Sequence, residues 1–229
     1  AFTTVQVQAF NTDQVVALET RDLAALTTAQ IAALTTSQAK ALTTDQIVAL
    51  GTNQASALAT LDVQVLTTDQ IVALETRDLA LLTTAQIASL TTSQVAALTT
   101  AQIVALGTNQ VSAITTAGIQ ALGTDQLTVL ETRDLAVLKT TQIQAFTTTQ
   151  IGALTTSQIQ ALTTTELAAL TTSQVKALTT DQVIALGTNQ VTAFTTVQVQ
   201  AFNTDQVVAL ETRDLAALTT AQIAALTTS

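Results

Sequence analysis

The sequence predicts an all-α fold, a solenoid or superhelix of very short helices with one helix per eight-residue repeat. Counted from Thr3, the chain divides into 28 complete octads, residues 3–226, without an insertion or deletion, so residues 1–229 read as a single continuous array. The consensus T-T-x-Q-I-x-A-L combines good helix formers with a Thr-x-x-Gln capping pattern. Eight residues overrun two helical turns by about 80°, so one continuous helix would not keep its apolar positions on one face. We therefore expect the helix to break at each Thr-Thr step.

The first half of the octad carries the signals of a helix start. In residues 27–30, Thr-Thr-Ala-Gln, the first Thr and the Gln have the spacing of a capping box. The first position also admits Gly51, Lys139 and Ala59, whereas the second position is Thr in every octad. We therefore expect the invariant second Thr to be the cap. Representative caps are Thr4, Thr12, Thr28, Thr36, Thr44, Thr84, Thr100 and Thr156.

The second half of the octad supplies the expected core. The fifth position is always apolar, and the eighth is usually Leu, with Phe and Ile as variants. Helices of five or six residues are unstable alone, so each must bury these positions against neighbouring repeats. Representative core residues are Leu26, Ile31, Leu34, Leu50, Ile87, Leu106, Ile151 and Leu162.

A β-solenoid with rungs of 16 or 24 residues is the alternative fold. An eight-residue period keeps strand alternation in phase, and Thr, Val and Ile favour strands. Segments such as D-L-A-A-L favour helix instead, and the chain lacks Pro and the Asn-Gly or Asp-Gly turns that connect strands.

A longer period is superimposed on the octads. Residues 1–37 recur unchanged as residues 193–229, which indicates a tandem unit of 192 residues. Within it, an E-T-R-D octad recurs at separations of seven, seven and ten octads. These spacings fit a coil of about 3.4 octads per turn, in which the charged octads share one side and pair with equivalents two or three turns away to set the register. The possible register charges are Glu19, Arg21, Asp22, Glu75, Arg77, Asp78, Glu131, Arg133, Asp134, Glu211, Arg213 and Asp214.

Composition argues against several classes of function. The net charge is −9 with only seven basic residues, so neither nucleic acid nor an anionic membrane surface is an expected partner. Thr and Gln interrupt every apolar run, so no membrane insertion is expected. Without His or Cys to activate a nucleophile, we expect no enzyme and no catalytic site. No cofactor is expected, with calcium on recurring carboxylates such as Asp13 and Glu19 as the one metal considered.

Two known repeat families share features with this octad. Residues 42–50, Leu-Thr-Thr-Asp-Gln-Ile-Val-Ala-Leu, resemble the opening of the DNA-reading repeats of plant-pathogen transcription-activator effectors, but those units are about four times longer and basic, so DNA binding is not implied. Over its whole length the chain resembles the LTTxQIxAL arrays of very large bacterial proteins. That resemblance implies a repetitive extracellular or cell-surface element and names no activity.

We therefore expect a structural segment of an extracellular bacterial fibre, stalk or filament. The stability of a solenoid increases with the number of repeats, so the array can become longer without any change in the sequence of the repeat. The 192-residue unit would repeat the same surface, and we expect the chain to associate with copies of itself. The alternative function is a surface binding module, an adhesin or an ice-binding array of Thr side chains.

Overall fold

The computed structural model describes residues 2–226, and these form 28 α-helices and no strand. Each helix lies in one octad, and the lengths run from four residues in α14 to seven in α28. The predicted all-α solenoid with one helix per octad is confirmed. The alternative β-solenoid is wrong, because the Thr and Gln side chains that would line strands instead cap helices.

The chain forms two compact units, residues Ala1–Ala121 and Leu122–Ser229, each described here by itself. Unit 1 contains α1 (Thr4–Gln8), α2 (Thr12–Val16), α3 (Thr20–Ala24), α4 (Thr28–Ile31), α5 (Thr36–Ala41), α6 (Thr44–Ala49), α7 (Thr52–Ala57), α8 (Thr60–Val65), α9 (Thr68–Ala73), α10 (Thr76–Leu79), α11 (Thr84–Ser89), α12 (Thr92–Ala97), α13 (Thr100–Ala105), α14 (Thr108–Val111) and α15 (Thr116–Ala121). Unit 2 contains α16 (Thr124–Thr128), α17 (Thr132–Leu135), α18 (Thr140–Ala145), α19 (Thr148–Ala153), α20 (Thr156–Ala161), α21 (Thr164–Ala169), α22 (Thr172–Lys176), α23 (Thr180–Ala185), α24 (Thr188–Thr192), α25 (Thr196–Gln200), α26 (Thr204–Ala209), α27 (Thr212–Ala217) and α28 (Thr220–Leu226).

Each helix begins at the second residue of its octad, and α12 illustrates how the first residue caps it. The cap Thr91 has extended backbone (φ −71°, ψ 161°), and its Oγ1 accepts the backbone N–H of Gln94 at 3.2 Å. In return, the Gln94 Oε1 accepts the backbone N–H of Thr91 at 2.8 Å. This reciprocal pair is a capping box, which satisfies two backbone donors that a helix start leaves free.

The expectation that the second Thr of each octad is the cap is therefore wrong. A cap needs an extended backbone, whereas the second Thr is already the first helical residue. This correction applies to Thr4, Thr12, Thr28, Thr36, Thr44, Thr84, Thr100 and Thr156. The caps of their helices are Thr3, Asn11, Thr27, Thr35, Thr43, Thr83, Thr99 and Thr155.

Two extended residues connect successive helices without a special turn. In α12 the helix ends at Ala97, and Leu98 is extended (φ −55°, ψ 133°) while its N–H still bonds the Val95 carbonyl at 3.3 Å. The next residue, Thr99, is the extended cap of α13 (φ −71°, ψ 158°). No described residue has a positive φ, so neither Gly nor Pro is required at the corners.

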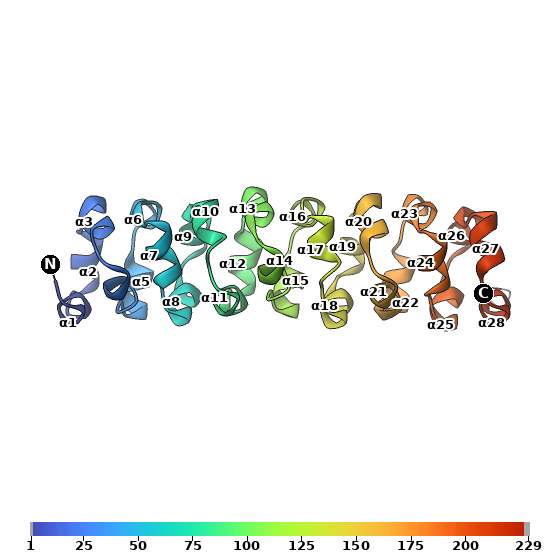
Figure 1. The fold of residues 1–229 in the computed structure, drawn as a ribbon, viewed down its shortest axis with the longest axis horizontal. Coiled ribbons are helices and arrows are strands. Elements are labelled where there is room, and N and C mark those ends of the chain that lie inside the picture. The colour runs from blue at the N-terminus through green and yellow to red at the C-terminus, as the bar shows by residue number, and fades with distance from the viewer. Residues whose placement is uncertain (1, 227–229) are drawn as a thin grey trace. The chain divides into compact units, whose positions relative to one another are not determined.

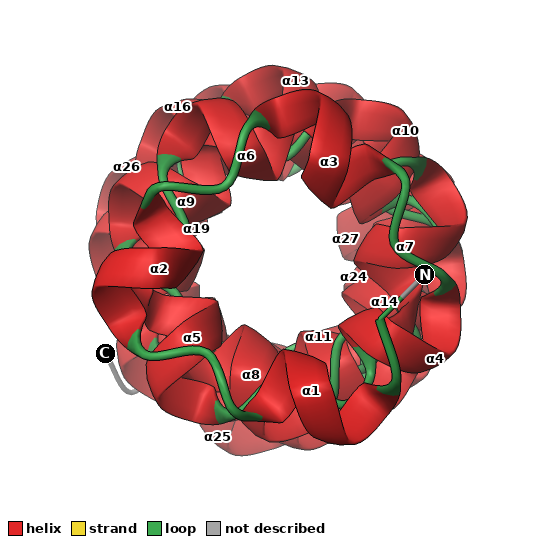
Figure 2. Cartoon of the chain, turned by 90° about the vertical axis from the view of Figure 1, so that its left-hand side faces the viewer, coloured by secondary structure: helices red, strands yellow, loops and turns green. Residues whose placement is uncertain are grey.

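Within each unit the helices wind into a coil. Every helix contacts the helix three octads further on, from α1 with α4 to α12 with α15 in unit 1, and from α16 with α19 to α25 with α28 in unit 2. In Figure 1 the helices α3, α6, α10 and α13 follow one edge of unit 1. Figure 2, which looks at unit 1 from the side of α1, shows α1, α2 and α3 at successive places around a common axis.

The core lies between successive turns of the coil. Fifth-position and eighth-position side chains are buried through most of both units. The predicted core residues Ile31, Leu34, Leu50, Ile87, Leu106, Ile151 and Leu162 are confirmed, with exposed fractions of 7% or less. The prediction that Leu26 is a core residue is wrong, because its side chain is only half-buried. It lies in the first turn of unit 1, where the described chain has no earlier turn to cover the eighth position.

The corrected position of the cap predicts unequal effects at two adjacent Thr residues. Thr91→Ala removes the cap oxygen and is expected to lower the free energy of unfolding by about 1 kcal/mol. Thr92→Ala, at an exposed first helical residue, is expected to change it by less than about 0.5 kcal/mol. Urea unfolding of the two full-length variants measures the difference. A larger loss for Thr92→Ala would contradict the assignment.

Candidate functional site

The contact that repeats through the molecule is made by the fourth residue of the octad. Gln94 is 2% exposed, and its Oε1 is occupied by the capping box of its own helix. Its Nε2 points to the previous turn, where it donates to the carbonyls of Val63 at 2.9 Å and Leu66 at 2.7 Å. Val63 belongs to α8, and Leu66 follows that helix. One amide group therefore caps the start of one helix and satisfies carbonyls at the end of another.

The same pattern recurs as a ladder along both units. In each rung the Nε2 of a fourth-position Gln donates to the carbonyls 31 and 28 residues earlier. The Gln residues with both bonds include Gln38, Gln46, Gln54, Gln70, Gln94, Gln102, Gln110, Gln158, Gln174, Gln182, Gln190, Gln198 and Gln206. We call this set the Gln ladder.

The ladder and the helix contacts together define the pitch. The bonds of the Gln ladder reach the octad four positions earlier, whereas helix-to-helix packing joins octads three positions apart. A turn therefore contains between three and four octads. The number predicted from the sequence, about 3.4 octads per turn, lies between these two limits. A coil with a whole number of two or four octads per turn is excluded within each unit.

Carboxyl groups replace the ladder Gln at several positions. Glu166 is 3% exposed, and its Oε2 accepts the Thr163 N–H at 2.6 Å, as the amide oxygen of Gln does elsewhere. Its Oε1 occupies the place of the amide nitrogen and has no hydrogen-bond partner. Burial raises the pKa of Glu166, opposed by the hydrogen bonds from Thr163. Burial likewise raises the pKa of Asp62, opposed by the backbone N–H of Ala59.

One ladder position carries no side chain at all. A Cβ on Gly118 would lie 2.8 Å from Cγ2 of Ile114, closer than real Cβ contacts allow. Ile114 is the β-branched variant at an eighth position that is usually Leu. The two substitutions therefore compensate, with the extra branch of Ile114 filling the space in front of Gly118.

The register charges pair inside their own octads. Arg77 Nε lies 2.6 Å from Glu75 Oε2 and 3.5 Å from Asp78 Oδ1. Arg21 pairs in the same way with Glu19 and Asp22, Arg133 with Glu131 and Asp134, and Arg213 with Glu211 and Asp214. The expectation that these groups pair across two or three turns is therefore wrong, because each Arg finds both carboxylates within two residues.

The expected side-by-side placement of these octads agrees with the fold of unit 1. Figure 1 places α3 and α10, which carry the E-T-R-D motif, along the same edge.

Asp78 differs from the exposed Asp22, because it is fully buried and neither of its carboxylate oxygens has a hydrogen-bond partner. The Arg side chains are largely exposed, so each pair contributes little on its own.

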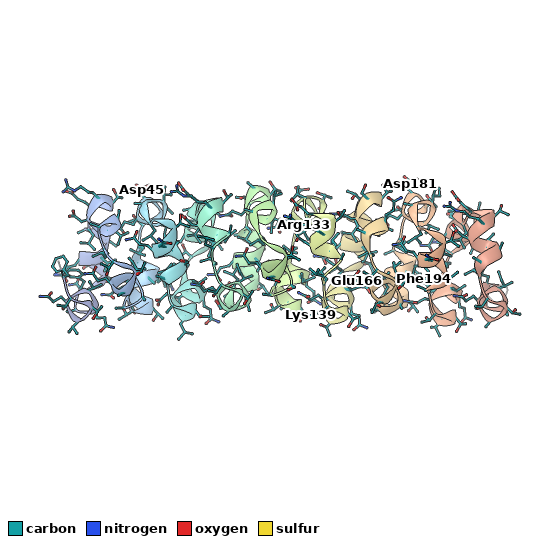
Figure 3. All side chains as sticks on the ribbon, viewed as in Figure 1. Asp45, Arg133, Lys139, Glu166, Asp181 and Phe194 are labelled. Atoms are coloured by element: carbon teal, nitrogen blue, oxygen red, sulfur yellow. The ribbon has the colours of Figure 1, made fainter. Side chains whose placement is uncertain are left out.

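A second group of octads forms an exposed acidic and apolar strip in each unit. These octads carry Asp at the third position and a large apolar residue at the sixth. In unit 1 they are α2, α6 and α9, separated by four and three octads, so they return to one side of the coil. In unit 2, Figure 3 places Asp181 at one edge and Lys139 at the opposite edge. The exposed residues are Asp13, Asp45, Asp69, Val16, Val48 and Val72 in unit 1, and Asp181, Asp205, Ile184 and Val208 in unit 2.

Among the described residues, no group of three or more acidic, His or Cys side chains gathers closely enough to hold a metal ion. Between residues 2 and 226 no helix has the length and apolar character of a membrane span.

Sequence reasoning missed the second role of Gln. The capping-box spacing accounts for its amide oxygen, but nothing local accounts for its amide nitrogen. Glu satisfies a capping box equally well, yet the fourth position is Gln in 21 of the 28 octads and Glu in only one. That preference was the available signal for a donor acting elsewhere.

Removing one rung of the ladder is expected to destabilise the coil. Gln94→Leu keeps similar bulk but leaves two carbonyls of the previous turn without this donor, which we expect to cost at least about 2 kcal/mol. Gln64→Leu, an exposed Gln at a sixth position, is the control and should change stability by less than about 0.5 kcal/mol. Equal effects in urea unfolding would contradict the ladder.

Glu166 is expected to make stability depend on pH. Because its native pKa is raised, the folded chain keeps a proton that the unfolded chain releases, so this contribution is present below the ordinary Glu pKa and is lost as pH rises through the native pKa. Glu166→Gln supplies a permanent donor. Its advantage over the wild type in urea unfolding should be small near pH 4 and grow toward pH 7. An advantage independent of pH would refute this assignment.

The comparisons with known proteins agree with the repeat. A family model described as the ALTTAQ repeat matches residues 15–52, 71–108, 127–164, 159–188, 183–212 and 207–229, which is more than half of the chain. The first three matches begin 56 residues apart, seven octads, each in the octad before an E-T-R-D motif. A search of curated proteins found no match. Because this model matches more than half of the chain, the chain belongs to the ALTTAQ repeat family.

Proposed function

We propose that this chain is a non-catalytic structural segment of an extracellular bacterial fibre, stalk or filament. The observation that carries the proposal is the Gln ladder, in which the same contact joins successive turns within each unit. A contact that connects only neighbouring turns permits any number of turns. Length is then set by copy number, which is the property a stalk or spacer needs.

The surface of each unit supports association between copies. Exposed Asp and apolar side chains return to one side of unit 1 at intervals of three and four octads. In unit 2 the exposed Lys139 lies on the side opposite Asp181. Contact between two copies along such a strip would remove its exposed apolar side chains from water.

The proposed extracellular location is supported by composition. The acidic composition and the absence of a basic patch fit neither nucleic acid nor an anionic membrane as a partner. A long array without Cys folds independently of the redox state of its surroundings. These properties support a role outside the bacterial cell.

The second candidate, a surface binding module, is favoured by one observation. The second-position Thr residues Thr44, Thr68 and Thr100 are exposed, and they belong to α6, α9 and α13, separated by three and four octads. An adhesin or ice-binding role for this row stays a prediction.

Tandem copies of the 192-residue unit test the structural role. Proteins of one, two and three units are expected to gain equal length per unit in electron micrographs, with unfolding that requires more denaturant as units are added. Antibodies against the chain are expected to label material outside intact cells by immunogold microscopy. A contour length that does not grow with copy number, or label found only after permeabilisation, would contradict the proposal.

A further inference from the structure

Two carboxyl side chains stand where the Gln ladder has an amide group, and both lie well inside their units. Asp62 is 2% exposed in α8 of unit 1, and Glu166 is 3% exposed in α21 of unit 2. The octad that follows each of them contains a complete rung, made by Gln70 in unit 1 and by Gln174 in unit 2. Each carboxyl therefore interrupts a series of amide rungs.

Gln174, one octad after Glu166, is the complete rung for comparison. Its Nε2 donates to the carbonyls of Ile143 and Phe146, both at 2.8 Å. These acceptors lie 31 and 28 residues earlier, the spacing that defines the ladder. The amide nitrogen thus places its two hydrogens against two oxygen atoms of the previous turn.

Glu166 places an oxygen atom in the position of that nitrogen. The same spacing sets it against the carbonyls of Leu135 and Leu138, and its Oε1 has no hydrogen-bond partner. An ionised carboxyl can only accept, so the rung then brings acceptors together away from water, which is unfavourable. A protonated carboxyl has one O–H donor and can reproduce one of the two bonds of the amide. The Oε2 can accept the Thr163 N–H in both states.

Among the described residues, no ion pair joins Glu166 to a charged group of the helices packed against it. Helix α21 packs on α18 and α24, and its rung reaches the octad of α17. The α18 octad carries Lys139, the α24 octad carries no charge, and the α17 octad carries Glu131, Arg133 and Asp134. Arg133 pairs with Glu131 and Asp134, and Lys139 is exposed. Figure 3 labels Glu166, Arg133 and Lys139.

Asp62 repeats this arrangement in unit 1. Its Oδ2 accepts the Ala59 N–H at 3.2 Å, and the ladder spacing sets it against the carbonyls of Ile31 and Leu34. Helix α8 packs on α5 and α11, and its rung reaches the octad of α4. The only charged residue in these three octads is the exposed Lys40.

The energetic preference of these two carboxyls differs from that of the other buried carboxyl in unit 1. Burial raises the pKa of Asp62 and of Glu166, opposed by the hydrogen bonds from their caps. Asp78 instead has the Arg77 Nε 3.5 Å from its Oδ1, so a positive charge lies beside its ionised form. The E-T-R-D octads therefore form a different kind of rung.

We propose that Asp62 and Glu166 are proton-operated latches between turns of the coil. When protonated from solvent, each donates to a carbonyl of the previous turn and closes its rung. When ionised, each lets the two turns part locally, while the complete rungs beside it hold. The coil then loosens at one place in each unit as the surroundings change from acidic to neutral. The inference rests on the structural role proposed above and adds a control of stiffness to it.

Native-state hydrogen exchange of the full-length chain, followed by mass spectrometry, measures opening at a single rung. Glu166→Gln installs the amide, so residues 163–169 should exchange like the wild type near pH 4 and about 10-fold more slowly near pH 8. The variant and the wild type are compared at the same pH, so the intrinsic pH dependence of exchange cancels. Residues 171–176, at the complete rung of Gln174, should exchange alike in both proteins.

Gln174→Glu is the reverse change, because it installs a latch at a complete rung. Residues 171–176 should then exchange about 10-fold faster than in the wild type near pH 8 and nearly as in the wild type near pH 4. The matched control is Gln160→Glu, which makes the same chemical change at an exposed sixth position and should leave exchange unchanged. Circular dichroism verifies that each variant is folded.

Two results would overturn the latches. One is a ratio of exchange rates between wild type and Glu166→Gln, in residues 163–169, that is the same near pH 4 and near pH 8. The other is an equal change in all segments of the chain, because opening would then be global and not confined to one rung. Either result leaves the length gained per tandem unit unaffected, so the structural role is tested separately.

Discussion

The amide group of the fourth-position Gln is the interaction on which the rest of the molecule depends. A helix of four to seven residues has almost all of its backbone groups at an end, where no partner within the helix exists. Water would normally satisfy those groups, which makes such helices unstable alone. Gln94 supplies an acceptor to its own helix start and a donor to the previous turn. One side chain thereby satisfies an N–H group at the start of its own helix and carbonyl groups at the end of a helix in the previous turn.

Much of this fold could be predicted from the sequence. The octad period, the capping pattern and the apolar fifth and eighth positions predict short helices stacked in a coil, because each depends on residues close together in the chain. The prediction that the second Thr is the cap is wrong, because this invariant residue is already helical and does not have the extended backbone of a cap. The structure places the cap at the more variable first position, where Gly51 and Lys139 also serve because Gln still bonds the cap N–H.

Two of the parts that could not be predicted involve contacts about thirty residues apart. The destination of the Gln amide nitrogen and the buried state of Asp78 depend on which octads become neighbours in space. The spacing of the E-T-R-D octads did predict that one turn of the coil contains between three and four octads. It could not reveal that each Arg pairs within its own octad, because local and distant pairing use the same residues.

The fractional pitch has a consequence for how such genes can change. Within a coil, one octad advances the chain by between a quarter and a third of a turn. Losing one consensus octad would keep the type of contact between turns, because most octads share the same cap and core positions, but it would rotate the later surface residues of that unit to a different side. Losing seven would restore the sides almost completely. Selection for a continuous surface strip would therefore tolerate slippage of the coding repeats in blocks of seven while removing single-octad events, and family matches that begin 56 residues apart are consistent with such a history.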